Sequence, residues 1–395
     1  MLDPGLTYVT VMTPRGIGAI ASCLVFGPEA FRAVNDCFAP RREKPLVMAD
    51  QGRVLFGKWQ GTEELLVCVR DEKSIEVHCH GGMAAVTAVI SSLVDAGCQR
   101  CDNDRLQELT ESDPLVRLAA QLLPDAPTAR TAGLLLQQYR GALAGPLDQI
   151  LEDLEGGRSS AALRGLDRLC DFSGLGRHLV KPWRVCLAGA PNVGKSSLLN
   201  ALAGYQRAIV HDRAGTTRDQ VTVSTVVDGW PLELVDTAGL CESDEPLEQA
   251  GMELARASME SADVVLLVID ASQPDSGDGL PAGQLEDPLL VLNKWDLVDA
   301  ETVSGPDLLE PPDPVAGREG VRISATAAWG IERLLEYLSR RLVPSPPGEG
   351  QRVPCGDELI DAISQAARAV ACGETGSAIL LLKHWSSPDR NGRSG

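Results

Sequence analysis

The sequence predicts an α/β domain with a mostly parallel sheet, inserted in an α-helical domain and preceded by a small α+β domain. Two observations carry this prediction. Between residues 182 and 343, short apolar runs alternate with segments of helical periodicity, as in strands that are each followed by a helix. On both sides of that region, leucine and other apolar residues recur at helical spacing.

The amino-terminal part changes character near residue 105. Strand-type runs in 7–26 and 53–80 precede an amphipathic helix at 83–97, which predicts an α+β domain over residues 1–105. Residues 106–181 come next, with helical spacing interrupted by Gly-Pro and Gly-Gly pairs, and form the first part of the helical domain.

The carboxyl-terminal part is organised around a linker. Residues 182–343 form the α/β domain, and the proline- and glycine-rich stretch 344–350 separates it from the end of the chain. Residues 351–395 form the second part of the helical domain, with a final helix at about 358–371.

Composition excludes some classes of protein. The formal net charge of −19 argues against a chain that coats nucleic acid by bulk electrostatics, but it leaves room for a local basic patch. The longest apolar run, Val264–Ile269, is too short to span a bilayer, so no membrane association is expected. The 11 cysteines, with no signal peptide in view, predict free thiols and a cytoplasmic location.

The strongest motif is a phosphate-binding loop between a predicted strand and a predicted helix. The apolar run 184–188 leads into a Gly-x-x-x-x-Gly-Lys-Ser sequence that ends at Ser196. Gly189 and Gly194 let the backbone curl so that its N–H groups face phosphate oxygens. Lys195 can reach the β- and γ-phosphates and acts in catalysis, and the Ser196 hydroxyl can bind Mg²⁺.

Two further elements fit the same phosphates. In the loop Ala214–Asp219, Thr217 is the expected second Mg²⁺ ligand, with Thr216 the next choice. Asp236 ends an apolar strand and can hold Mg²⁺ through water, and the Gly239 N–H can bond the γ-phosphate.

Two last elements select the base. In Asn293–Asp296, the aspartate can accept two N–H bonds from guanine that adenine cannot supply, and Lys294 can cover the base. Ser324–Thr326 can offer a backbone N–H to the guanine oxygen. The sequence therefore predicts a site that binds GTP and hydrolyses it. The residues expected to contact the nucleotide are Asn192, Val193, Gly194, Lys195, Ser196, Ser197, Asp236, Gly239, Asn293, Lys294, Asp296, Ser324 and Ala325.

Hydrolysis must differ from that in Ras-like enzymes, because Leu240 stands where those enzymes carry a water-orienting glutamine. The acid-rich segment 241–253 could supply the polar group, although from spacing alone each acid is more typical of a solvated helix start. Its acids are Glu242, Asp244, Glu245, Glu248 and Glu253. A monovalent cation or a partner chain could neutralise the charge that develops between the β- and γ-phosphates.

These motifs resemble one known family, the MnmE (TrmE) tRNA-modification GTPases. The resemblance rests on Pro191–Asn200, Ala214–Asp219 and Asp236–Leu240, and extends to Thr13–Ile20 and Glu76–Gly82. It implies that the amino-terminal domain is similar to folate-binding modules and dimerises, and that the GTPase domain is inserted in the helical domain.

The resemblance also implies roles for particular residues. Asn192 matches the family's K⁺-binding asparagine, which implies K⁺-stimulated hydrolysis. The loop that contains His211, Arg213 and Thr216 matches the cation-binding loop, whose ligands are mostly backbone carbonyls. Glu248 matches the family's water-orienting glutamate and becomes the expected catalytic acid.

The implied partners are tRNA, a folate one-carbon donor and a flavin-dependent enzyme, with which the family modifies the wobble uridine. The family's Cys-x-Gly-Lys tail is absent from this sequence, whose last cysteine is Cys372. Two other hypotheses therefore stay open: a divergent regulatory or ribosome-associated GTPase, and a nucleotide-binding scaffold that does not hydrolyse GTP. The adjacent residues His78, Cys79 and His80 lack the spacing of a metal site.

Overall fold

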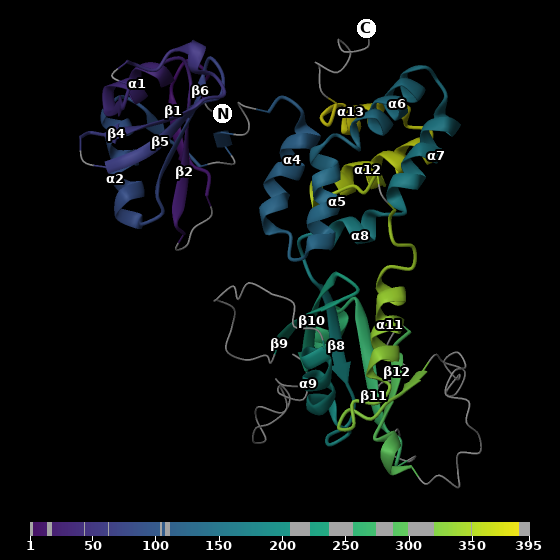
Figure 1. The fold of residues 1–395 in the computed structure, drawn as a ribbon. Helices are drawn as coiled ribbons and strands as arrows, with labels where there is room; N and C mark the ends of the chain where they lie inside the picture. The colour runs from purple at the N-terminus through teal and green to yellow at the C-terminus, as the bar shows by residue number, and fades with distance from the viewer. Residues whose placement is uncertain are drawn as a thin grey trace, which may run out of the picture. The chain divides into compact units, whose positions relative to one another are not determined.

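The computed structural model describes most of the chain and divides it into two compact units (Figure 1). The described residues are 3–13, 18–42, 44–61, 63–102, 105–106, 111–205, 222–236, 256–273, 287–298, 320–348 and 350–386. The first unit runs up to Arg117 and the second from Leu118 to Ser386. No helix in these ranges is long and apolar enough to cross a lipid bilayer.

The first unit is a seven-stranded sheet with helices packed on it. The strands follow the order β3-β4-β5-β6-β2-β1-β7, and all neighbours are antiparallel except β1 and β7. The elements are β1 (Tyr8–Val11), β2 (Ile20–Phe26), α1 (Ala30–Cys37), β3 (Phe38–Pro40), β4 (Val54–Trp59), β5 (Glu63–Val69), β6 (Ser74–His80), α2 (Met83–Asp95) and β7 (Gln99–Arg100).

Burial alternates along these strands, which is why one face of the sheet forms the core. Val25, Val67 and Val77 are fully buried, together with Val89 and Leu93 of α2. The strands and the helix that the sequence predicts in 53–97 are confirmed.

A charged contact stabilises the long connection between β3 and β4. Asp50 is buried, and it accepts hydrogen bonds from two guanidinium nitrogens of Arg42. The Val47 N–H donates to the same carboxylate at 3.0 Å. Nearby, the Asn35 side chain bonds both the C=O and the N–H of Leu46.

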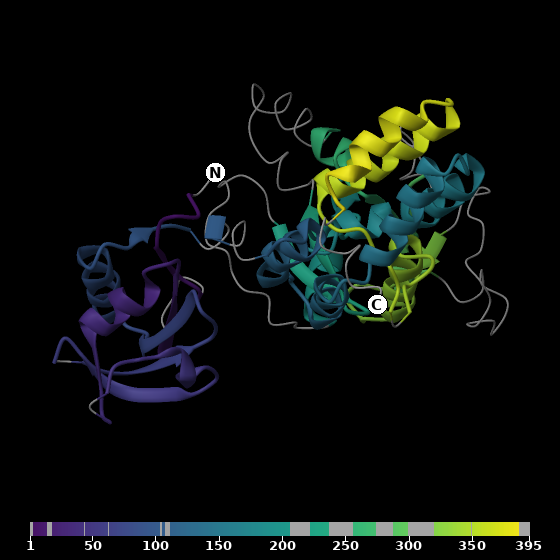
Figure 2. The same cartoon turned by 90° about the horizontal axis from the view of Figure 1, so that it is seen from above.

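The second unit combines helices with a second sheet. Its helices outside the sheet region are α4 (Pro114–Leu122, which begins in the first unit), α5 (Ala129–Tyr139), α6 (Ala144–Glu155), α7 (Ser159–Cys170), α8 (Ser173–Arg177), α12 (Asp357–Ala371) and α13 (Thr375–Lys383). The helix α12 packs on α7, and α13 packs on α6 and α12, as both views show (Figure 1, Figure 2).

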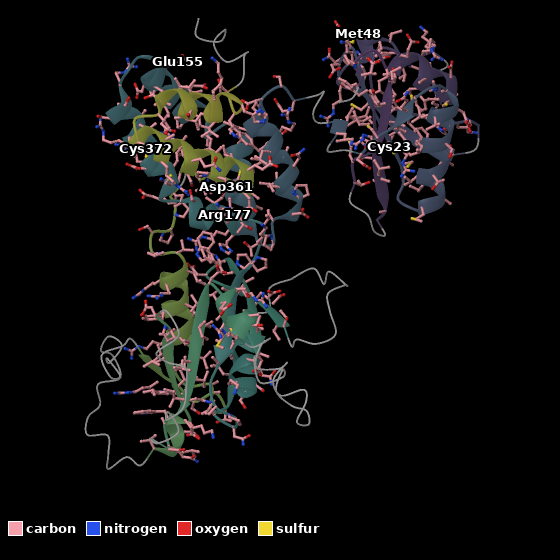
Figure 3. All side chains as sticks on the ribbon, turned by 180° about the vertical axis from the view of Figure 1, so that it is seen from behind. Cys23, Met48, Glu155, Arg177, Asp361 and Cys372 are labelled. Carbon is pink, nitrogen blue, oxygen red and sulfur yellow. The ribbon has the colours of Figure 1, made fainter. Side chains whose placement is uncertain are left out.

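Ion pairs reinforce the contact between helices far apart in the sequence. Arg177 of α8 bonds Asp357 and Asp361 of α12, at 2.9 and 2.5 Å, and Lys181 bonds Asp357 at 2.6 Å. Figure 3 shows Arg177 and Asp361 on facing elements.

The prediction that the helix near 358–371 is the final one is wrong, because α13 comes after it. Gly373, at φ +83°, ends α12 and turns the chain. The apolar run of α13 has little polar alternation, and Leu380 is exposed. The helix therefore lacks the amphipathic periodicity that would have indicated it.

The sheet of the second unit has six strands in the order β13-β12-β11-β8-β10-β9. Every neighbouring pair is parallel except β9 and β10, so the predicted mostly parallel sheet is confirmed. The elements are β8 (Trp183–Ala188), α9 (Lys195–Tyr205), β9 (Thr222–Val227), β10 (Trp230–Asp236), β11 (Val264–Asp270), β12 (Leu289–Asn293), β13 (Gly320–Arg322) and α11 (Ile331–Leu342).

The turn between β9 and β10 is held by the start of α5. Thr128 caps α5, and its hydroxyl donates to the Gly229 C=O at 2.7 Å. Arg130 donates to the Asp228 C=O at 2.6 Å, and its guanidinium lies 4.3 Å from the ring centre of the buried Trp230. A hydrogen-bonded cap and a cation–π contact thus fix this turn.

Candidate nucleotide site

The phosphate loop lies where the central strand β8 ends and α9 begins. Gly189 has φ +149°, and a Cβ there would lie 2.3 Å from the Val268 C=O. Gly194 has φ +96°, and a Cβ there would lie 2.3 Å from the Asn293 side-chain nitrogen. Both positions therefore require glycine. The loop brings the backbone to the amino-terminal end of α9, where phosphate oxygens are stabilised by N–H groups and the helix dipole.

Lys195 is the first residue of α9 and lies folded against this loop. Its side chain is buried, and its Nζ donates to the carbonyl oxygens of Gly189 and Ala190, both at 2.8 Å. The ammonium group is thus held at the centre of the loop, where a nucleotide's phosphates would meet it.

Ser196 and Asp236 come together from neighbouring elements. The Ser196 hydroxyl donates to the Asp236 carboxylate at 2.9 Å, and Asp236 is buried at the carboxyl end of β10. A hydroxyl and a carboxylate provide the oxygen ligands that Mg²⁺ prefers. The residues present therefore fit a magnesium ion, as expected beside a phosphate loop of this kind.

Asn293 joins the phosphate loop to the base-recognition segments. Its side chain is buried, donates to the Val193 C=O at 2.8 Å, and accepts from the Ala325 N–H at 3.0 Å. Because one amide satisfies a carbonyl and an N–H from two separate loops, it fixes both relative to the end of β12.

Lys294 comes next, in a left-handed conformation with φ +62°. Its Nζ lies 2.7 Å from a carboxylate oxygen of Asp270, at the end of β11. Burial opposes ionisation of Asp270, but the hydrogen bonds from Lys294 and Ser272 lower the pKa of the carboxyl below its ordinary value. The carboxylate thus stays charged and holds the lysine in place.

The last two elements of the predicted site adjoin this pair. Asp296 is exposed in a short helical turn, Trp295–Leu297, so its carboxylate is accessible to a base. Ser324 is buried, and its hydroxyl accepts a hydrogen bond from the Ala327 N–H at 3.1 Å. The Ala325 N–H donates to the Asn293 side chain, so in this structure it fixes the segment Ser324–Thr326 beside the end of β12.

The structure therefore brings the described site residues to one edge of the sheet. The predicted residues that lie outside the described part of the chain are His211, Arg213, Thr216, Thr217, Gly239 and Glu248. Sequence reasoning missed Asp270, although the pattern that pointed to Asp236, an aspartate after an apolar strand, also occurs there.

The two histidines considered as metal ligands have separate partners. His78 Nδ1 lies 2.8 Å from the Ser22 hydroxyl, and His80 Nδ1 lies 3.1 Å from a Glu63 carboxylate oxygen. Within the described ranges, no group of three or more His, Cys, Asp or Glu side chains could hold a metal ion.

A parallel sheet with a Gly-x-x-x-x-Gly-Lys-Ser loop, a hydroxyl–carboxylate pair and an Asn-Lys-x-Asp segment at one edge defines a P-loop GTPase. Residues 184–294 match the family model described as 50S ribosome-binding GTPase. The chain as a whole belongs to the MnmE family of tRNA-modification GTPases, as its relatives show.

These relatives cover most of the chain. It is 32% identical to the tRNA modification GTPase MnmE of Syntrophotalea carbinolica, over 85% of this chain and 81% of the relative. The MnmE of Akkermansia muciniphila is 33% identical, over 88% and 84%. The MnmE of a Synechococcus species is 31% identical, over 93% and 87%.

Solved structures match a smaller part. Era in complex with MgGDPNP and a segment of 16S ribosomal RNA is 29% identical, over 48% of this chain and 67% of that chain, with a TM-score of 0.31. The FeoB G-domain of Methanococcus jannaschii is 24% identical, over 41% and 98%, with a TM-score of 0.29. The assignment to the MnmE family therefore rests on the sequence identity to the MnmE proteins, and not on these solved structures.

Proposed function

We propose that this chain hydrolyses GTP at the edge of its parallel sheet and that hydrolysis serves the modification of the wobble uridine in certain tRNAs. The observation that carries the nucleotide part of the proposal is the pair of hydrogen bonds by which Asn293 ties the phosphate loop to the base-recognition segments. The relatives that cover most of the chain are named for tRNA modification. The ribosome-binding description belongs to a model that matches residues 184–294 alone.

The described side chains have separate roles in binding the nucleotide. Lys195 binds the β- and γ-phosphates with the N–H groups at the start of α9. Ser196 and Thr217 would bind Mg²⁺ directly and Asp236, which accepts from the Ser196 hydroxyl in this structure, would hold the ion through water. The bound ion would neutralise phosphate charge. Asp296 accepts two N–H bonds from guanine.

Base selection gives a direct test. Xanthine carries a carbonyl where guanine carries its exocyclic amine, so Asp296→Asn, which replaces an acceptor by a donor, should favour xanthosine triphosphate over GTP. Turnover of both nucleotides by the wild-type chain and by this variant measures the effect. An unchanged preference would remove Asp296 from base recognition.

Glu248 is proposed to orient the attacking water, and K⁺ to neutralise charge between the β- and γ-phosphates. K⁺ is proposed because Asn192 matches the family's K⁺-binding asparagine, and the Asn192 side chain is exposed in the phosphate loop and so accessible to a cation. Its other proposed ligands come from the loop with His211, Arg213 and Thr216. GTP turnover measured in K⁺ and in Na⁺ tests the role of K⁺, and equal rates in the two salts would reject that role. The Glu248→Ala variant should lose most of its GTP turnover.

The larger organisation is also proposed from the family. The GTPase domain, 182–343, is inserted between the helical parts 106–181 and 351–395, which agrees with the packing of α12 on α7. Residues 1–105 form a dimerising domain that takes a folate one-carbon donor, and a flavin-dependent enzyme is the partner. Restoration of wobble-uridine modification by this gene in a strain that lacks its MnmE tests the proposal, and failure would favour a regulatory role.

A further inference from the structure

A cavity of about 550 Å³ lies in the helical part of the second unit, among α6, α7 and the segment that leads to α12. Its lining includes the apolar residues Ile150 and Leu169, which are otherwise buried. The backbone at Gln351 is held to α5, because the Gln138 side chain donates to the Gln351 C=O at 3.3 Å. The helices α6 and α7 pack on each other, and the segment at Gln351 is anchored to α5.

Three arginines converge on this cavity. Arg164 and Arg168 lie one turn apart on α7, and Arg352 adjoins the anchored Gln351. All three are exposed, and none forms an ion pair with a described residue. Like charges four residues apart destabilise a helix slightly, and the aspartates three residues after each of the two, Asp167 and Asp171, form no ion pair with them in the described part of the chain.

Among the described lining residues, Asp153 is the acidic one, and it is already engaged. Its carboxylate lies 2.7 Å from Nε of Arg158, and Gln149 donates to the same oxygen at 3.4 Å. The cavity is therefore basic in a chain whose formal net charge is −19. Such a local excess of positive charge attracts an anion that the remaining surface repels.

The form of the cavity narrows the class of anion. Cavities of about 300–1,000 Å³ suit a small molecule or a nucleotide rather than a single ion. The apolar part of the lining fits the face of a base, and the exposed guanidinium groups fit a phosphate and can also stack on a base. An acidic peptide would offer carboxylates for the arginines, but it would need an aromatic side chain as well to fill the apolar part of the lining.

We infer that this cavity binds a nucleotide of the tRNA substrate, with Arg164, Arg168 and Arg352 on its phosphates. The inference rests on the proposed function and gives its tRNA a docking site in the helical part, apart from the GTP site. Sequence-independent phosphate contacts here position the RNA, while recognition of the wobble uridine occurs elsewhere.

The test measures binding of a fluorescein-labelled tRNA transcript with a wobble uridine to the full-length chain, by anisotropy at several salt concentrations. Each phosphate contact contributes a salt slope of about 0.9, so Arg164→Gln with Arg168→Gln should weaken binding roughly 30-fold at about 0.15 M salt and lower the slope by about 2. Adding Arg352→Gln to this variant should weaken tRNA binding by about a further fivefold. GTP turnover should not change.

Two matched variants separate charge at the cavity from charge in general. Arg333→Gln with Arg340→Gln removes the same charge from exposed positions of α11 and should leave tRNA affinity near that of the wild type. Arg164→Lys with Arg168→Lys keeps the charge and should retain most of the affinity and of the salt slope.

Each remaining outcome overturns a distinct statement. If the wild type binds tRNA and the cavity variant loses no more affinity than the α11 control, the inference is wrong and the proposed function stands. If the cavity variant binds tRNA normally but no longer supports modification in cells, a protein partner occupies the cavity instead. If the wild type neither binds tRNA nor restores modification, the proposed function falls together with the inference.

Discussion

Substitution of Asn293 by alanine tests whether the tether organises the nucleotide site. The change removes the hydrogen bonds to the Val193 C=O and from the Ala325 N–H, at 2.8 and 3.0 Å, in a buried position. A buried group left without its partner costs about 1–3 kcal/mol, so the two together cost roughly 2–6 kcal/mol. The cost divides between the free energy of unfolding and the free energy of GTP binding.

The share that falls on binding is measurable. Without the tether, the two loops must be ordered by the nucleotide, and a cost of about 1.4 kcal/mol weakens affinity about tenfold. Titration with a fluorescent GTP analogue gives the affinity, and urea unfolding gives the stability. We expect both to decrease.

Asn35→Ala is the matched control. Asn35 makes the same pair of bonds, to the C=O and from the N–H of Leu46, but in the first unit. It should reduce stability and leave GTP affinity unchanged. If Asn293→Ala behaves in the same way, the tether supports only folding, and its assigned role in the site is wrong.

Three further substitutions have defined outcomes. Asp270→Asn removes the charge that holds Lys294 and should weaken GTP binding by about 1 kcal/mol, or roughly fivefold in a titration; unchanged affinity would contradict the role of Asp270. The Arg42 hydrogen bonds lower the pKa of Asp50 to about 2 from 3.8, so the pair stabilises the folded chain above about pH 4, and this stability is lost as the pH falls toward 2. Acid unfolding should therefore begin at a higher pH in the Asp50→Asn variant than in the wild type. Acid-unfolding curves that coincide for the two proteins would refute this role of the pair. Arg130→Ala removes the cation–π contact with Trp230 and the hydrogen bonds to the β9–β10 turn. The free energy of unfolding, measured in urea, should fall by about 1–3 kcal/mol. The same substitution at the exposed Arg140 should leave it unchanged.

Much of the nucleotide site could be predicted because its motifs are local. The sequence around Gly189 and Lys195 requires a particular backbone and a helix directly after it, and both are present. The contact between Asn293 and Val193 joins residues 100 positions apart, so no local pattern encodes it. Its detection required the register of β12 beside β11, which positions the end of that strand at the phosphate loop.

The arginine cavity could not be predicted for a related reason. In the sequence, Arg164 and Arg168 are typical of the exposed face of an amphipathic helix, and Arg352 of a linker. Only the packing of α6 and α7 and the anchoring of Gln351 bring them to one cavity. The helix α13 was missed because an apolar run without polar alternation carries no periodic signal.

The packing of α12 on α7 and of α13 on α6 also has a consequence for synthesis. The helices α6 and α7 are translated long before α12 and α13, which pack on them. Roughly 190 residues separate the end of α7 from the start of α12, which corresponds to about 10–40 s at typical rates of elongation. During that interval the nascent chain presents an uncovered apolar surface, so the helical part completes its folding only when the last helices leave the ribosome.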